Sequence, residues 1–339
     1  MIHRMLVVGA GLSGAVIARE LAERGYEIDV IEKRNHIGGN CYDYIDSSGI
    51  RVHKYGPHIF HTNNKKVVNW LSRFTDWIDY KHKVKAILDD GTLVTIPPNK
   101  QTLLTIGRGN IVDVIFRPYT RKMWNKEIEE LDASILKRIP LREDDNELYF
   151  PNDSFQALPS DGYTALIEKI LNHKNISLTL DKNFEMSMEA NYHHVFNSMP
   201  IDEYYDFKYG HLPYRSIIFH TQKIPVPKLM TVPTTNFTHD GPYTRVTEWK
   251  LFPKHGSNKY ETVLTFEEPV DYKMNNFERY YPVKDIDGNN RSTYKKYHNI
   301  PNSKVTFIGR CGMYVYIDMD QAVSTALSIS KKFSQNGKF

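Results

Sequence analysis

Cysteine is scarce in this chain, since only Cys41 and Cys311 among its 339 residues carry a thiol. Two cysteines cannot build the disulfide framework of a small secreted domain, so we expect a reducing, cytoplasmic compartment. The chain also lacks an uncharged apolar run long enough to cross a membrane. Glycines interrupt the apolar stretch within residues 1–18 and an amphipathic pattern follows, which argues against a signal peptide. We expect no membrane association.

A strong excess of one charge is absent as well. Lys and Arg number 44 against 40 Asp and Glu, which gives a net charge of +4, and no basic block stands out. This balance is unlike that of a nucleic-acid-binding protein and is compatible with a small anionic substrate. Internal repeats and low-complexity segments are also missing. The length allows one large domain or two to three smaller ones.

A glycine-rich turn near the N-terminus is the clearest motif. Residues 5–8 form an apolar run typical of a buried strand, and residues 15–21 are apolar at helical spacing. Between them lie Gly9, Gly11 and Gly14 in the spacing G-x-G-x-x-G. The first glycine permits a tight bend, the second lets the backbone approach a pyrophosphate, and the third lets the helix pack on the strand. Because a helix N-terminus offers free N–H groups to phosphates, the turn predicts a dinucleotide site.

The residues that follow favour FAD over NAD. A second predicted strand, residues 28–31, ends in Glu32, whose carboxylate can bond the adenosine ribose. Gly38 and Gly39 then provide a second close approach of the backbone, which the longer FAD requires. Near the C-terminus, a predicted strand at 305–308 runs into Gly309-Arg310. A helix predicted from residue 318 to residue 333 presents another N-terminus to the flavin.

These patterns predict an α/β fold with a discontinuous Rossmann-like FAD-binding domain, a small helical insert and an antiparallel β-sheet substrate domain. We assign residues 1–75, 156–200 and 300–339 to the FAD-binding domain, 76–98 and 201–299 to the antiparallel sheet, and 99–155 to a reduced helical lid region. Helices are expected at residues 67–74, 111–124, 131–138 and 163–171, strands at 177–180 and 194–197, a hairpin around 89–91, and a loop at 138–155.

Motifs along nearly the whole chain resemble those of UDP-galactopyranose mutases. They are residues 32–40 (EKRNHIGGN), 53–62 (HKYGPHIFHT), 119–124 (YTRKMW), 137–142 (KRIPLR), 242–245 (PYTR), 280–283 (YYPV) and 316–321 (YIDMDQ). The resemblance implies a flavin-dependent mutase that interconverts a nucleotide-linked hexopyranose and hexofuranose, with UDP-galactopyranose and UDP-galactofuranose as the first choice. In this family N5 of reduced FAD attacks the anomeric carbon, and arginines hold the nucleotide diphosphate. NAD(P)H or another reductant would prime the FAD.

The resemblance also implies roles for single residues. Arg142 would close over the diphosphate from a loop, Arg245 would face it from the sheet, and His58 would lie beside the flavin near N5. The implied contacts to the nucleotide sugar are Tyr119, Trp124, Phe155, His82, Arg215, Asn236, Tyr281, Tyr316 and Asp318. Together with the glycine motif, the predicted cofactor contacts are Gly9, Gly11, Ser13, Gly14, Glu32, Lys33, Gly39, Asn40, His58, Ile59, Met199, Arg310, Met319 and Gln321. No metal site is predicted, because no acid or cysteine joins the histidines of residues 53–61.

The chain departs from the family pattern at several places. The segment between Pro98 and Tyr119 is shorter than in typical bacterial members, so lid closure has to rest mainly on the loop that follows. Phe155 stands where a tyrosine is usual, His82 where an asparagine is common, and Met199 where a glycine lies beside the cofactor. These changes leave the sugar nucleotide open, with dTDP-fucose and UDP-N-acetylgalactosamine as alternatives.

Two other functions stay open at this point. An FAD-dependent oxidoreductase of the amine-oxidase type would share the glycine turn, but it predicts an apolar cleft without paired arginines. A degenerate protein would keep FAD and lack activity. As partners we expect a nucleotide-sugar substrate and no nucleic acid, with a homodimer as an open alternative.

Overall fold

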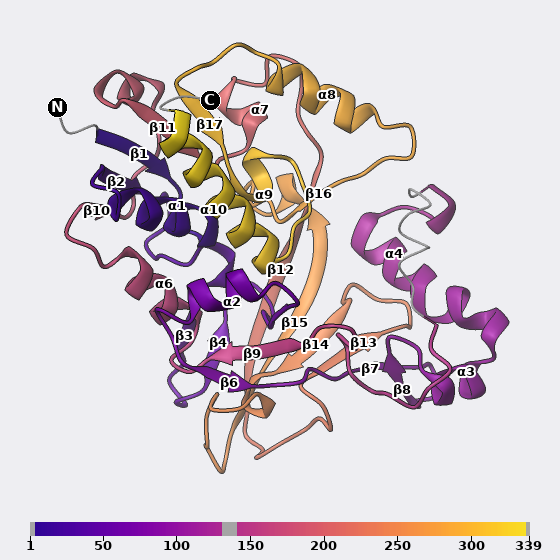
Figure 1. Cartoon of the computed structure of the whole chain (residues 1–339). Helices are drawn as coiled ribbons and strands as arrows, with labels where there is room; N and C mark the ends of the chain where they lie inside the picture. The colour runs from indigo at the N-terminus through magenta and orange to yellow at the C-terminus, as the bar shows by residue number, and fades with distance from the viewer. Residues whose placement is uncertain (1–3, 131–140, 337–339) are drawn as a thin grey trace.

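The computed structural model describes residues 4–130 and 141–336. Two sheets form its frame: a five-stranded sheet that contains the N-terminal strand and a seven-stranded sheet whose long strands lead away from it (Figure 1). The α/β fold predicted from the sequence is confirmed.

The five-stranded sheet is entirely parallel, in the order β10-β2-β1-β11-β17. Its strands are β1 (Arg4–Val8), β2 (Glu27–Ile31), β10 (Ile176–Thr179), β11 (His194–Asn197) and β17 (Val305–Phe307). Side chains of β1 alternate between two buried faces, since Met5 and Val7 belong to one hydrophobic cluster and Leu6 and Val8 to another. Burial on both faces is typical of a parallel sheet covered by helices, as the Rossmann-like prediction requires.

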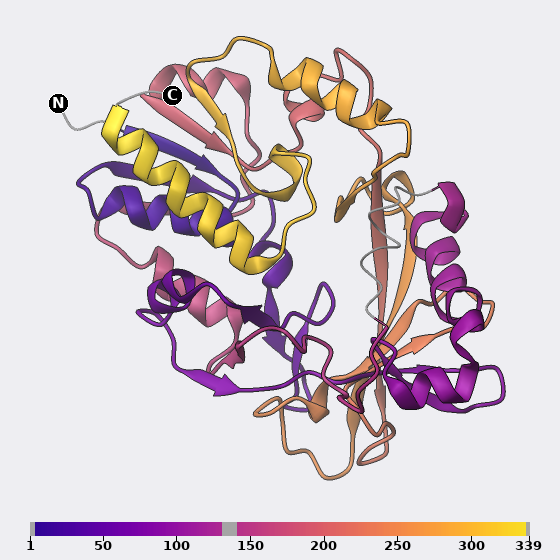
Figure 2. The same cartoon turned by 45° about the vertical axis from the view of Figure 1, so that its right-hand side comes forward.

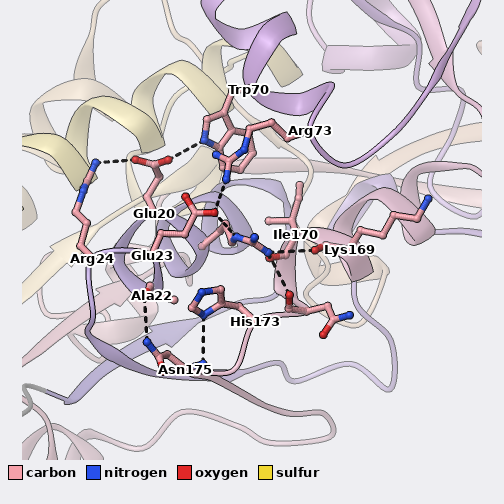
Figure 3. Close-up of polar contacts among 12 residues, drawn as sticks. Glu20, Ala22, Glu23, Arg24, Trp70, Arg73, Lys169, Ile170, His173 and Asn175 are labelled. Carbon is pink, nitrogen blue, oxygen red and sulfur yellow. Dashed lines mark hydrogen bonds and ion pairs between the residues drawn. The ribbon is translucent and has the colours of Figure 1, made fainter.

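The helices that share the cluster of Met5 and Val7 include α1 (Leu12–Ala22), α6 (Tyr163–Leu171) and α10 (Met319–Asn336). A polar network on α1 fastens it to α2 (Lys65–Leu71) and to Arg73, two residues after the end of α2 (Figure 3). Glu20 accepts a hydrogen bond of 2.7 Å from the Trp70 indole, and Glu23 pairs with Arg73. The network therefore holds two helices of the nucleotide-binding side together at the surface.

The seven-stranded sheet has the order β16-β12-β15-β14-β13-β7-β8, and only the β13–β7 pair is parallel. Its strands are β7 (Val84–Ile87), β8 (Leu93–Ile96), β12 (Tyr214–Ile224), β13 (Thr234–Phe237), β14 (Arg245–Glu248), β15 (Thr262–Asp271) and β16 (Tyr281–Pro282). The hairpin predicted around residues 89–91 is β7–β8. The strands of this sheet come from residues 84–96 and 214–282.

Helices pack beside β7 and β8, on the side of the molecule away from the parallel sheet (Figures 1 and 2). They are α3 (Lys100–Ile106), a turn at Arg108–Asn110, a π-helical turn at Val112–Phe116, α4 (Arg117–Trp124) and a turn at Ile128–Glu130. The sequence pattern missed α3, because only Thr102 and Leu103 of this helix are buried. The predicted helix at 131–138 lies outside the described residues.

The other elements complete the fold. Two small sheets pair β3 (Asp43–Ile45) with β4 (Arg51–His53), and β9 (Phe155–Pro159) with both β5 (Phe60–Thr62) and β6 (Trp77–Asp79). The remaining helices are α7 (Ile201–Tyr204), α8 (Asn289–His298) and α9 (Gly309–Gly312). Residues 141–154 contain neither helix nor strand. Over the described part of the chain, no helix is both long and apolar enough to span a membrane.

Candidate active site

A pocket of about 460 Å³ is lined by residues of the large sheet, of α4, of α9 and of the start of α10. Twenty residues line it, and twelve of them are predicted site residues. The predicted ones are His58, Ile59, His82, Tyr119, Trp124, Asn236, Arg245, Tyr281, Arg310, Tyr316, Asp318 and Met319. These positions span residues 58 to 319, so the fold brings together side chains that are far apart in the sequence.

The glycine turn has the shape that a dinucleotide needs. A Cβ on Gly14 would lie 2.0 Å from the Gly9 carbonyl oxygen, so no larger residue fits between helix and strand. Gly39 has a φ of +53°, and a Cβ there would lie 2.9 Å from the Cα of Gly11. The two glycine segments thus touch through backbone alone. Gly11 caps α1 without a side chain, which leaves the helix N-terminus open to a phosphate.

Glu32 closes the adenosine end of this turn. It is buried, and its carboxylate accepts hydrogen bonds from the amides of Ala10 at 2.9 Å and Arg34 at 3.0 Å. A carboxylate has further lone pairs, so the same group can accept bonds from two ribose hydroxyls. Asn40 accepts a bond from Arg34 at 3.1 Å, and Lys33 lies 3.8 Å from Glu278. The residues present fit the ADP half of FAD.

The opposite end of the cofactor site faces the pocket. Arg310 on α9 donates to the carbonyl oxygens of Tyr280 at 3.1 Å and Ile317 at 2.8 Å. These bonds fix the guanidinium with its carbon 4.8 Å from the centre of the Tyr316 ring. Met319 lines the pocket where α10 begins, so a helix N-terminus points to this end. Ser13 lies by Gly309, where an added Cβ would come within 3.5 Å of the Ser13 Oγ.

His58 enters the pocket from a tight turn. Its Nδ1 lies 2.8 Å from the Gly56 carbonyl oxygen, and burial lowers its pKa to about 4. The ring is therefore neutral near pH 7. Since a carbonyl oxygen can only accept, Nδ1 carries the proton and Nε2 is left as an acceptor.

Arg245 is the cation fixed in the wall of the pocket. Its Nε donates to Glu267 Oε2 at 2.8 Å, and Glu267 is 1% exposed. Burial by itself lowers the pKa of Arg245, but the carboxylate of Glu267 raises it well above the ordinary value. The guanidinium stays charged, and its position is set by two neighbouring strands, β14 and β15. A fixed guanidinium is well suited to phosphate oxygens.

Aromatic side chains surround this cation. Tyr281 and Tyr316 stack with ring centres 5.6 Å apart, and Trp124 meets Tyr281 edge-on at 6.5 Å. Burial raises the pKa of Tyr281 to about 12, so its hydroxyl keeps the proton that it can donate to an anionic oxygen. The Oδ1 atom of Asn236 is buried and has no partner among the described residues. It is therefore free to accept from a ligand.

His82 and Asp318 also reach the pocket. Burial lowers the pKa of His82 to about 3, and its Nδ1 lies 2.9 Å from the Tyr80 hydroxyl. Asp318 is exposed at the mouth, and its backbone amide donates to the side chain of Gln321 at 3.1 Å. Gln321 itself lines a neighbouring hollow with Asp318 rather than the pocket.

Besides Gln321 and the predicted cofactor contacts within residues 9–40, four predicted site residues lie outside the pocket lining. Arg142 donates to the carbonyl oxygens of Leu148 at 3.0 Å and Pro97 at 2.9 Å. Arg215 donates to those of Met123 at 2.7 Å and Lys122 at 3.1 Å, so it holds the C-terminal end of α4. The other two pack against hydrophobic clusters and are Phe155 and Met199.

Several lining residues were not among the predicted site residues, although Met123 and His61 lie within the motifs 119–124 and 53–62. They include Lys284, Met123, Tyr149, Phe150 and His61. Lys284 is exposed, directly follows the YYPV motif, and has no ion-pair partner among the described residues. The position of Lys284, three residues after Tyr281, is the sequence signal that could have identified it as a site residue. Glu267, the partner of Arg245, could not be found from sequence, because strand register alone places the two side by side.

Comparisons with known proteins agree with this geometry. A family model described as UDP-galactopyranose mutase matches residues 114–316, and one described as an NAD(P)-binding Rossmann-like domain matches residues 7–74. A Klebsiella pneumoniae protein named "Probable UDP-galactopyranose mutase" is 35% identical over 97% of this chain and 94% of its own length. The dTDP-fucopyranose mutase of Escherichia coli is 34% identical over 99% of this chain and 100% of its own length.

Solved structures add the fold. The structure of a reduced UDP-galactopyranose mutase superposes with a TM-score of 0.74 at 16% identity, covering 99% of this chain and 94% of the other. A fatty acid isomerase from P. acnes reaches 0.62 at 11% identity, with 98% of both chains covered, which shows a shared fold alone. With a family model spanning more than half of it and full-length relatives above 30% identity, the chain belongs to the UDP-galactopyranose mutase family of flavoproteins.

Proposed function

We propose that this protein interconverts UDP-galactopyranose and UDP-galactofuranose with FAD in its reduced form. The observation that carries the proposal is one pocket in which a fixed arginine, Arg245, meets the flavin-side residues His58, Arg310 and Met319. An anionic nucleotide and a flavin would therefore lie next to each other. Membership in the mutase family gives this arrangement its reaction.

The residues that would hold FAD are those of the glycine turn, Glu32 and the start of α10. Reduced FAD, once bound, supplies the nucleophile for the anomeric carbon, and NAD(P)H or another reductant primes it. The chain itself has to bind the sugar against the flavin, hold the nucleotide diphosphate after it leaves the sugar, and keep water out. Each of these tasks falls to residues of the pocket.

Holding the diphosphate is the task that Arg245 is best placed to perform. Its charge is secured by Glu267, and the hydroxyls of Tyr281 and Tyr316 stand in the same pocket. Lys284 and Arg310 add positive charge to the lining of the same pocket. A diphosphate that stays in place keeps the effective concentration of the second reactant high while the sugar rearranges. Tyr119 is our choice for the ring that stacks on the base, and Trp124 for the sugar end.

One alternative for the base and the sugar has specific support. The dTDP-fucopyranose mutase relative is nearly as similar as the UDP-galactopyranose mutase relative. The two ligands differ in a methyl group on the base, the 2′-hydroxyl of the nucleoside ribose and the 6-hydroxyl of the hexose, so we propose a direct comparison. We further propose a cytoplasmic enzyme, whose Cys41 and Cys311 are free thiols, and we retain a homodimer as a hypothesis for gel filtration.

The test is anaerobic turnover. Purified FAD-bound protein, reduced with dithionite, is incubated with UDP-galactofuranose, and the products are separated by chromatography. We expect UDP-galactopyranose from the reduced protein and none from the oxidised protein. The same assay with dTDP-fucofuranose ranks the two nucleotide sugars by kcat/KM. A protein that retains FAD and converts neither compound would overturn the proposal.

A further inference from the structure

Two buried histidines, His53 and His255, form a continuous chain with the half-buried His58 beside the pocket. The backbone N–H of His58 donates to Nδ1 of His53 at 3.1 Å, and Nε2 of His53 lies 3.1 Å from Nε2 of His255. Nδ1 of His255 lies 3.0 Å from the Pro253 carbonyl oxygen. His53 is 1% exposed and His255 is 4% exposed. No solvent-facing group therefore interrupts the chain.

The two ends of the chain determine every proton in it. A backbone N–H can only donate, so Nδ1 of His53 is the acceptor and its proton must lie on Nε2. That proton then points at Nε2 of His255, which has to accept. The remaining proton of His255 lies on Nδ1 and points at the Pro253 carbonyl, which can only accept. One arrangement of neutral rings satisfies all three contacts.

Burial keeps these rings neutral. It lowers the pKa of His53 well below the ordinary value and lowers those of His255 and His58 to about 4. His53 is enclosed by aromatic rings, with Trp249 at 5.0 Å and Tyr163 edge-on at 5.6 Å. The described residues contain no group of three or more ligand side chains suited to a metal ion. The 3.1 Å contact is a hydrogen bond between neutral rings.

The chain also connects two parts of the protein that are 202 residues apart. His53 ends β4, just before the turn that carries His58, and His255 lies in the connection between β14 and β15. The same connection receives a second bond, from the amide of Arg51 to the His255 carbonyl at 2.7 Å. β14 carries Arg245. These bonds thus fix the turn that carries His58 relative to β14, the strand that carries Arg245.

We propose that His53 and His255 are positioning residues that fix the turn of His58, so that its ring presents Nε2 to the pocket as a hydrogen-bond acceptor. With its own Nδ1–H bonded to Gly56, His58 is held at both its amide and its ring. An acceptor fixed there can take a hydrogen bond from an N–H of the reduced cofactor or from a sugar hydroxyl. This consequence for turnover rests on the proposed function; the arrangement of protons does not.

The protons can be observed directly. In FAD-bound protein labelled with ¹⁵N-histidine, long-range ¹H–¹⁵N correlation spectra distinguish rings protonated on Nδ1 from rings protonated on Nε2. We expect Nδ1–H for His58 and His255 and Nε2–H for His53, with signals assigned through single His→Gln variants. An Nε2–H ring at His58, or a charged ring at His53 at pH 7.5, would overturn the proposal.

Paired substitutions separate positioning from mere packing. In His53→Asn the amide oxygen replaces Nδ1 and keeps the bond to His58, whereas in His53→Gln it cannot. We expect kcat within about threefold of the unmodified protein for His53→Asn and about tenfold lower for His53→Gln, with KM for the nucleotide sugar changed by less than about twofold. His298→Gln, an exposed residue on α8, is the matched control.

Each outcome has a distinct meaning. If His53→Gln keeps both its kcat and the His58 signal, the positioning role is wrong even though the mutase activity stands. If the protein shows the expected tautomers and His53→Gln abolishes the Nδ1–H signal of His58, the positioning role is supported, including in a protein without mutase activity. In that last case the proposed function alone fails.

Discussion

Two arginines predicted to serve the same diphosphate lie in regions built in different ways. Arg245 is on a strand in the middle of the large sheet, paired with buried Glu267 and lining the pocket. Arg142 is in the irregular segment 141–154, outside the pocket lining, where two backbone carbonyl oxygens hold its guanidinium. One cation is in place before any ligand arrives. Arg142 has to give up its bonds to these carbonyl oxygens before its guanidinium can reach a diphosphate in the pocket.

The partners explain the difference. A carboxylate at full burial fixes a guanidinium strongly, because removing either member leaves an unpaired buried charge. Carbonyl oxygens are neutral acceptors, and a typical hydrogen bond to a charged group contributes only about 1.5–3 kcal/mol. Arg142 also keeps its Nε without a partner among the described residues. Contacts of this kind are compatible with a segment that changes position when an anion binds.

The largest expected effect comes from Arg245→Ala. We expect kcat/KM to fall about 1000-fold or more, because the substitution removes the fixed cation and leaves Glu267 unpaired. Bound FAD, measured by absorbance, should be retained, since the glycine turn is untouched. Arg73→Ala in the surface network of Figure 3 is the control and should keep activity within about twofold. Activity near the unmodified level in Arg245→Ala would refute the assignment of the diphosphate site.

Arg142→Ala tests the other side of the comparison. If the segment closes over the diphosphate, kcat/KM should fall about 100-fold, and the loss should appear in both kcat and KM. Stability should also fall by about 1–3 kcal/mol, because the carbonyl groups of Pro97 and Leu148 lose their donors. Glu143→Gln, one residue further on, is the control. A variant that is less stable but fully active would make Arg142 an anchor of the segment and nothing more.

How far the sequence reaches also differs between regions. The parallel sheet and the glycine turn follow from local patterns, since the strand, turn and helix are contiguous and each glycine has a steric reason. Contacts such as Arg245–Glu267 depend on the register of β14 against β15, which no local pattern specifies. Helix α3 was missed for a related reason, because it buries too few residues to show an apolar period.

The predicted site shows the same division. Motif residues in the turn at 53–62 and at the start of α10 line the pocket, because the short elements around them fix the direction of their side chains. Arg215 is different: its guanidinium bonds the end of α4, and only the packing of that helix on the sheet could reveal this role. Phe155 packs with Phe60 and Trp77 in the core, which fits the absence of a hydroxyl at this position.

Acid should first destabilise the protein through its buried neutral histidines, and only at lower pH through the ion pairs of the segment 141–154. His82 and His255 are both nearly fully buried, and burial lowers their pKa values to about 3 and about 4. Unfolding returns each to about 6.5, so the unfolded state binds more protons below that pH and stability falls as pH falls from 6.5 towards 4. Between pH 7.5 and 5.5 we expect a loss of about 1 kcal/mol for each histidine. Urea unfolding at the two pH values measures it, and equal stabilities would show that these rings are not buried neutral.

The smallest expected effect is in the segment that carries Arg142. Glu147 pairs with Lys85 at 2.6 Å and Lys83 at 2.8 Å, and hydrogen bonds from these two lysines lower its pKa to about 2. The carboxylate is 39% exposed, so Glu147→Gln should cost no more than about 1 kcal/mol at pH 7 and low salt.

The folded pKa of Glu147 is the lower one, so the contribution is complete above about 4.5 and disappears as pH falls towards 2. It should also disappear in 1 M NaCl. Melting temperatures of Glu147→Gln and the unmodified protein, compared at both salt concentrations, measure it. A difference that persists in high salt would mean that packing, and not charge, anchors the segment. No difference at low salt would leave its backbone contacts, the Arg142 bonds and the bridge between Lys83 and Leu148, as the restraint that an incoming diphosphate has to release.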